Sequence, residues 1–135
     1  MYNYDGPERR RHHRQRAHFI TNYRITQPPE VIMNIGQDSF EAVMLDLSEG
    51  GMAIVTRHNI PEKTTMSLEW TLINPHAVED DRIRKFEVIG EVRDCDQLEE
   101  DEFRLGITFV GIGDGDQKAI AEFIRANRRD KESGT

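Results

Sequence analysis

The apolar residues of this chain recur at two spacings, and the change between them falls near the C-terminal end. From Phe19 to Phe109 they alternate with polar residues in most of the chain, which is the spacing of half-buried β-strands. After that, Ile120, Phe123 and Ile124 follow the three- and four-residue spacing of one helix face. The chain is therefore expected to fold into several short strands followed by a single helix.

Turn-forming residues divide the alternating part into six or seven short runs. Pro28 and Pro29 separate the first two runs, and Gly50 and Gly51 separate two later ones. Many short strands at close spacing are typical of an all-β sandwich or barrel, and we predict a small antiparallel β-barrel with the helix over one opening or face. The runs expected to form strands are residues 19–25, 31–35, 40–47, 52–56, 64–73, 86–92 and 103–109.

Charge divides the chain into a basic arm and an acidic body. Residues 1–24 carry six arginines against two acidic residues, a net charge of +4, whereas residues 25–135 have a net charge of −11. An acidic body argues against general binding to a nucleic-acid backbone, which needs a broad positive face. A basic arm on such a body indicates a more local anionic partner.

Several other classes of protein and site are excluded or disfavoured. No apolar run approaches the roughly 20 residues of a membrane span, and the N-terminus lacks the apolar segment of a signal peptide, so we expect a cytoplasmic domain. Cys95 is the only cysteine, which excludes an internal disulfide. Ser48 has no nearby histidine base, and His12, His13 and His18 lack a partner at metal-ligand spacing. Neither an enzyme nor a metal site is predicted.

Two short motifs remain, Arg10-x-x-x-Arg14 in the arm and Asp46-x-Ser48-x-x-Gly51 in the body. Alone, each has an ordinary explanation, a basic tail for the first and a capped β-turn for the second. Together they fit a guanine nucleotide. Arginine can donate two hydrogen bonds to guanine O6 and N7 or pair with phosphate, and a carboxylate can accept from guanine N1–H and its exocyclic amine. Ser48 adds a hydroxyl, and Gly51 allows a tight turn close to a ligand.

The order of these motifs on a small barrel resembles a PilZ domain. The resemblance runs from Glu8 to Ile124 and includes the runs 88–93 and 105–109 and the closing helix. PilZ domains are six-stranded barrels that act as receptors for the bacterial second messenger cyclic dimeric GMP (c-di-GMP). The resemblance implies six ligand-binding residues. Arg10 and Arg14 would hold guanine edges and phosphates, Asp46 and Ser48 would read a guanine, Gly51 would shape the loop, and Arg9 is similar to the residue of members that bind a stacked pair of ligands.

The resemblance also implies an organisation and a mechanism. Residues 1–17 would be a flexible ligand-binding arm, residues 18–129 the barrel with its helix, and residues 130–135 a tail. The arm would fold onto the barrel when c-di-GMP binds, and the chain would signal to a protein effector in trans, with no other cofactor, no nucleic acid and no membrane span. Two alternatives stay open. One is a PilZ-fold module that contacts other proteins without a nucleotide, and the other is a small barrel that binds nucleic acid through its arm.

Overall fold

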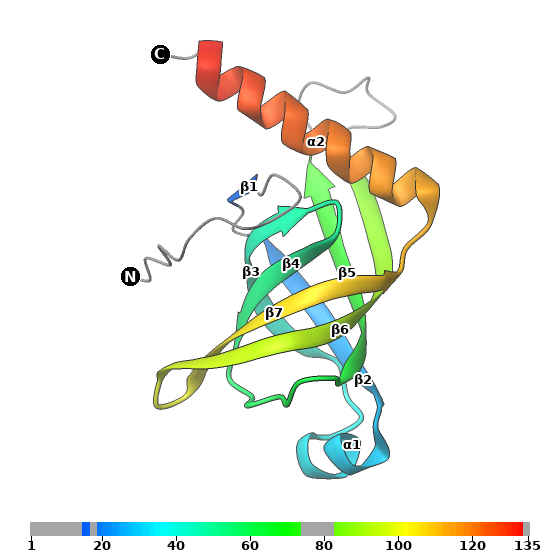
Figure 1. Cartoon of the computed structure of the whole chain (residues 1–135), viewed down its shortest axis with the longest axis vertical. Coiled ribbons are helices and arrows are strands. Elements are labelled where there is room, and N and C mark those ends of the chain that lie inside the picture. The colour runs from blue at the N-terminus through cyan, green and yellow to red at the C-terminus, as the bar shows by residue number, and fades with distance from the viewer. Residues whose placement is uncertain (1–14, 17–18, 74–82, 134–135) are drawn as a thin grey trace.

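The computed structural model describes residues 15–16, 19–73 and 83–133 of the chain, with side chains described for residues 19–73 and 83–126. Seven strands and two helices make up this part (Figure 1). Their order is β1 (Gln15–Arg16), β2 (Ile20–Gln27), α1 (Pro29–Ile35), β3 (Phe40–Ser48), β4 (Gly51–Thr56), β5 (Thr65–Ile73), β6 (Ile83–Glu99), β7 (Glu102–Gly111) and α2 (Asp114–Ser133).

Six of the strands close into an antiparallel barrel. Along the sheet they follow the order β3-β2-β5-β6-β7-β4, and pairing of β3 with β4 joins the two ends. The short strand β1 pairs with the part of β3 that β2 does not reach. The predicted small antiparallel barrel is confirmed, and six of the seven predicted runs form its six strands.

Alternating side chains of the strands fill the barrel. In β5 the residues Met66, Leu68 and Trp70 point inward and are at most 2% exposed. The indole of Trp70 stacks on Phe86 and Phe109, with ring centroids 5.1 Å and 5.8 Å away. Such offset aromatic contacts add to the hydrophobic free energy of burial, so this cluster is a major part of the core.

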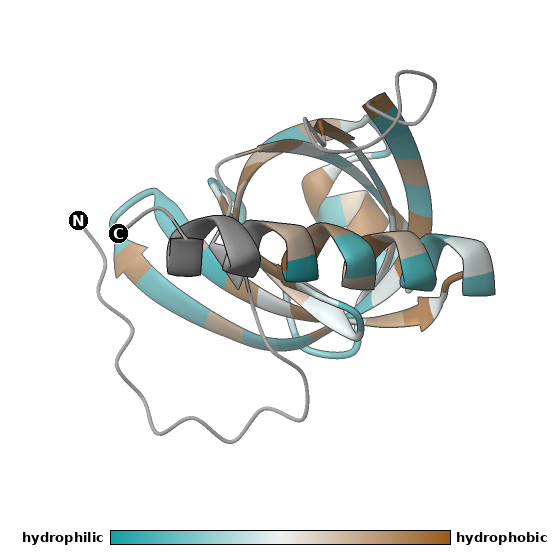
Figure 2. Ribbon diagram, turned by 90° about the horizontal axis from the view of Figure 1, so that it is seen from above, coloured by the Kyte–Doolittle hydropathy of each residue, from teal (hydrophilic) through white to brown (hydrophobic). Residues whose placement is uncertain are grey.

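Helix α2 crosses one mouth of the barrel, as the view from above in Figure 2 shows. Its residues Ile120, Phe123 and Ile124 are buried, and the Phe123 ring meets Phe19 edge to face at 6.1 Å. These are the three residues on which the sequence prediction of the helix depended, and that prediction is confirmed. Within the described part of the chain, no helix has the length and apolar character that a membrane crossing requires.

The predicted strand at residues 31–35 is wrong, because this segment lies in helix α1. Pro29 occupies the first helical turn, where its missing N–H costs no hydrogen bond, and Val31 is the residue that the helix buries. The helix ends at Gly36, whose φ of 124° is a conformation that other residues rarely adopt. Helix α1 lies at the end of the barrel opposite α2 (Figure 1).

The buried residue Tyr23 leads to a prediction for alkaline pH. Its hydroxyl oxygen lies 2.7 Å from Thr56 Oγ1. Burial raises the pKa of Tyr23 to about 12, and the hydrogen bond with Thr56 lowers this pKa by a smaller amount. Between roughly pH 10 and 12 the unfolded chain loses this proton before the folded chain does, so the free energy of unfolding should fall by about 2 kcal/mol. Urea unfolding across this pH range should show a smaller fall for Tyr23→Phe. Equal falls for both proteins would contradict the assignment.

Candidate functional site

The second predicted motif lies at the β3–β4 hairpin, at the end of the barrel that α2 covers (Figure 1). Asp46 and Ser48 are near the end of β3, and Gly51 begins β4. Ser48 and Gly51 face each other across the two strands, with Glu49 and Gly50 as the turn. The structure therefore brings these three predicted site residues together in one short hairpin.

A β-bulge sets the direction of Asp46. The pairing of β3 with β4 shifts register between Met44 and Asp46, so Leu45 is an extra residue in β3. Met44 before the bulge and Leu47 after it are both fully buried, although they are an odd number of residues apart. In a regular strand Asp46 would share the inward face of Met44, whereas the bulge leaves it partly exposed on the outer side. The bulge thus makes this carboxylate accessible.

Ser48 holds the turn of the hairpin together. Its side chain is 3% exposed, and its Oγ accepts the Gly50 N–H and donates to the Gly51 carbonyl, both at 3.3 Å. The Gly50 carbonyl in turn accepts the Phe109 N–H of β7 at 2.8 Å. The hydroxyl that the sequence assigns to a ligand therefore also has a structural use, which is to keep the hairpin in one conformation.

Gly51 is required by the contact between β4 and β7. A Cβ atom added to Gly51 would overlap the carbonyl oxygen of Ile107, which belongs to the backbone of β7. From the sequence, Gly51 was expected to allow a tight turn that brings the backbone close to a ligand. The described structure supplies another reason, since no larger residue lets the two strands pack at this distance.

The described end of the arm pairs with the hairpin. In β1, Arg16 lies opposite Asp46 and Gln15 lies opposite Leu47 in an antiparallel ladder. Helix α2 contacts both β1 and β3, and Gln117 of α2 donates to the Glu49 carbonyl at 3.5 Å. The chain that leads into the arm is thus held beside the carboxylate of the second motif, which sequence spacing alone did not predict.

The predicted arginines Arg9, Arg10 and Arg14 lie outside the described residues. Arg14 is joined directly to Gln15 of β1 in the sequence, and Arg10 is four residues further toward the N-terminus. Their assignment to the site stays a prediction. In the described part of the chain, no group of three or more histidine, cysteine or acidic side chains is arranged to hold a metal ion.

Solved structures with the same fold are similar to this chain at low sequence identity. The inhibitor of motility MotI/DgrA of Bacillus subtilis superimposes with a TM-score of 0.69 at 19% identity, over 93% of this chain and 53% of that one. The PilZ domain of YcgR from Escherichia coli, solved with c-di-GMP, superimposes with a TM-score of 0.60 at 16% identity. The match covers 94% of this chain and 98% of that domain. For the MrkH–c-di-GMP complex of K. pneumonia the TM-score is 0.64 at 13% identity, over 96% of this chain and 57% of MrkH.

This chain therefore spans about half the length of MotI/DgrA and of MrkH, and nearly the whole isolated PilZ domain of YcgR. No curated protein sequence matches it. The family model described as the PilZ domain matches residues 8–126, a range that includes both motifs, all strands of the barrel and most of α2. With this match over most of its length, the chain belongs to the PilZ domain family.

Proposed function

We propose that this chain is a receptor for c-di-GMP that binds its ligand between the β3–β4 hairpin and the arm. Membership of the PilZ family supports the proposal, as do the c-di-GMP complexes of the YcgR PilZ domain and of MrkH, which have the same fold. In this proposal the chain is a regulatory receptor and not an enzyme, and c-di-GMP is its ligand, with no further cofactor.

The pairing of Arg16 with Asp46 is the observation that carries this proposal. It holds Gln15 and Arg16, which follow Arg14 directly in the sequence, opposite Leu47 and Asp46 of β3. In this proposal both halves of a guanine site therefore start from one place in the fold. Asp46 would accept the guanine N1–H and amine hydrogens. Arg10 and Arg14 would donate to O6, N7 and phosphate oxygens, because the planar guanidinium fits such acceptors with two parallel hydrogen bonds.

The other members of the site have supporting roles in the proposal. Ser48 would contact the guanine while it holds the turn, and Gly51 would keep β4 close to β7. Arg9, next to Arg10 in the sequence, would stack on or pair with a second c-di-GMP, so that two ligands bind as a stacked pair. The site would be lined by charged and polar groups, as a ligand with two phosphates requires.

We assign residues 1–17 to the arm, residues 18–129 to the barrel with its helix and residues 130–135 to a tail. Ligand binding would change the conformation of the arm. Ordering about ten residues costs on the order of 10 kcal/mol of conformational free energy, so several charge-assisted contacts are needed to offset it. The ligand would also neutralise the charge of the motif arginines and so change the surface that the chain presents to a partner. We propose that a separate protein effector recognises this changed surface.

Alanine variants of the two motif arginines test the proposal. Arg10→Ala and Arg14→Ala should each weaken c-di-GMP binding by roughly 10- to 100-fold, because each loses charge-assisted hydrogen bonds. Isothermal titration calorimetry measures the affinity, and thermal unfolding verifies that the variants fold. Arg24→Ala removes the same side chain from the exposed face of β2 and should bind like the unaltered chain. Equal affinity in all these proteins would show that the arm does not form the site.

A further inference from the structure

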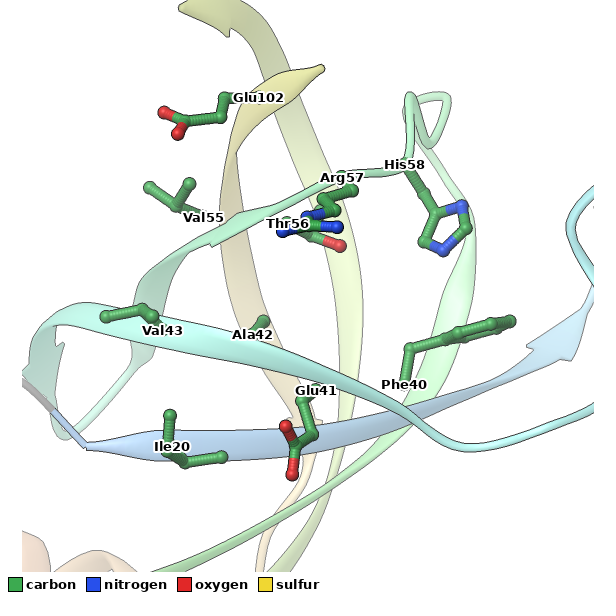
Figure 3. Close-up of a pocket in the computed structure, with 10 residues that line it drawn as sticks. All are labelled: Ile20, Phe40, Glu41, Ala42, Val43, Val55, Thr56, Arg57, His58 and Glu102. Carbon is green, nitrogen blue, oxygen red and sulfur yellow. The ribbon is translucent and has the colours of Figure 1, made fainter.

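An apolar row crosses the outer surface of three strands of the barrel. Ile20 of β2 pairs with Val43 of β3, and Val43 also pairs with Val55 of β4. Ile20 is 52% exposed, Val43 is 40% exposed and Val55 is half-buried. Together they line a groove of about 470 Å³, which Figure 3 shows from outside the barrel. Outward positions of a barrel in water are usually polar, so this row is suited to a protein contact.

Three side chains with a formal charge line this groove, Glu41, Arg57 and Glu102, of which the first two have opposite charges and lie beside the apolar row. Glu41 precedes Val43 by two residues in β3, and Arg57 follows Val55 by two residues just after β4. Because β3 and β4 are antiparallel, both steps run in the same direction along the barrel. Figure 3 accordingly shows Glu41 and Arg57 on the same side of the apolar row. The groove thus has two parallel rows of side chains. The β3 line consists of Val43 and Glu41, and the β4 line consists of Val55 and, just after the strand, Arg57.

This arrangement is complementary to itself. Two copies of the chain can meet at this groove across a two-fold axis. The axis lies in the plane between the two copies and runs parallel to β3 and β4, midway between them. Rotation about it exchanges the β3 line with the β4 line and keeps the position along the strands. Val43 of one copy then meets Val55 of the other, and Glu41 meets Arg57. One symmetry operation therefore places Val43 on Val55 and pairs Glu41 with Arg57, and it does each of these twice per interface.

We propose that this face is the interface of a two-fold symmetric dimer of the chain. A second copy satisfies all four side chains at once, whereas a partner with a single sign of charge would leave Glu41 or Arg57 opposite a like charge. The contact consists of two valine pairs and two ion pairs, far fewer residues than the roughly 20–30 on each side of a stable interface, so we expect a dimer that dissociates in the micromolar range. The inference does not depend on c-di-GMP binding, because none of the residues that carry it belongs to the proposed ligand site.

Charge exchange at Glu41 and Arg57 tests the dimer by sedimentation equilibrium over micromolar protein concentrations. Glu41→Arg alone and Arg57→Glu alone should each weaken dimerisation about tenfold or more, since two like-charge contacts replace two ion pairs. The double variant, which restores the pairs in exchanged positions, should dimerise like the unaltered chain. An equimolar mixture of the two single variants should form heterodimers, because both charged contacts of a heterodimer are again between opposite charges.

The control variant Glu87→Arg makes the same change on the exposed outer face of β6 and should leave dimerisation unaltered. Thermal unfolding of each variant establishes that a loss of dimer is not a loss of fold. A monomer of the unaltered chain at all concentrations would overturn the proposal. So would single variants that dimerise as well as the unaltered chain, or a mixture of them that stays monomeric.

Discussion

Replacing Asp46 by asparagine is expected to weaken c-di-GMP binding by about 100-fold or more. The carboxylate offers two acceptors to the guanine N1–H and amine, whereas an amide offers one acceptor and turns a donor toward the other hydrogen. The loss combines a missing charge-assisted hydrogen bond with an unfavourable contact, which is worth roughly 3 kcal/mol. Calorimetric titration with c-di-GMP measures the effect.

Asp96→Asn is the matched control for this substitution. Asp96 is an exposed residue of β6, and its replacement by asparagine should leave the affinity unaltered. Because Asp46 lies between β1 and β4, the unfolding temperature of Asp46→Asn has to be measured beside its affinity. A folded Asp46→Asn protein that binds c-di-GMP as tightly as the unaltered chain would remove Asp46 from the site.

Replacing Gly51 by alanine is expected to unfold the barrel or to lower its free energy of unfolding by more than about 3 kcal/mol. The added Cβ overlaps the carbonyl oxygen of Ile107, and both groups belong to paired backbone strands that cannot move independently. Relief of the overlap requires separation of β4 from β7, which also breaks the closure of the barrel. Urea unfolding followed by circular dichroism measures the loss.

Gly113→Ala is the control for the loss of stability expected in Gly51→Ala. Gly113 lies between β7 and α2, and a Cβ added there would have no atom within 4 Å. Its replacement should therefore change the free energy of unfolding by less than about 0.5 kcal/mol. If Gly51→Ala were as stable as Gly113→Ala, the close approach of β4 to β7 would not be the reason for a glycine in the motif.

Most strands of the barrel could be predicted because alternation is a local pattern. The expected run 103–109 corresponds to β7 (Glu102–Gly111), and the run 64–73 corresponds to β5 (Thr65–Ile73). Strand β6 extends well beyond its predicted run of 86–92, from Ile83 to Glu99. After Val92 it has no buried residue, so the alternation that reveals a strand is lost there although pairing with β7 continues.

Helix α1 could not be recognised from the same pattern. Four apolar residues within the five at 31–35 are too few to separate a helical from an extended spacing, and the two preceding prolines suggest a break. The structure shows that Pro29 starts a helix of seven residues. A proline in the first turn followed by a glycine just past the end is the signal that could have identified it.

The candidate site was predicted as residue types, but its geometry depends on contacts between distant parts of the chain. The bulge at Leu45 leaves a signal in the sequence. The buried apolar residues Met44 and Leu47 are three residues apart, whereas a regular strand buries every second residue. The clash that requires Gly51 involves Ile107, more than fifty residues away, and no local pattern reveals it. The pairing of β1 with β3 is of the same kind.

Calorimetric titration of the unaltered chain with c-di-GMP shows most simply whether this PilZ domain binds the nucleotide. We expect saturable binding with two c-di-GMP molecules per chain, heat that is absent with GTP at the same concentration, and a higher unfolding temperature in the presence of c-di-GMP. The absence of both heat and thermal stabilisation at tens of micromolar c-di-GMP would contradict this expectation. The fold would then serve protein contacts without a nucleotide.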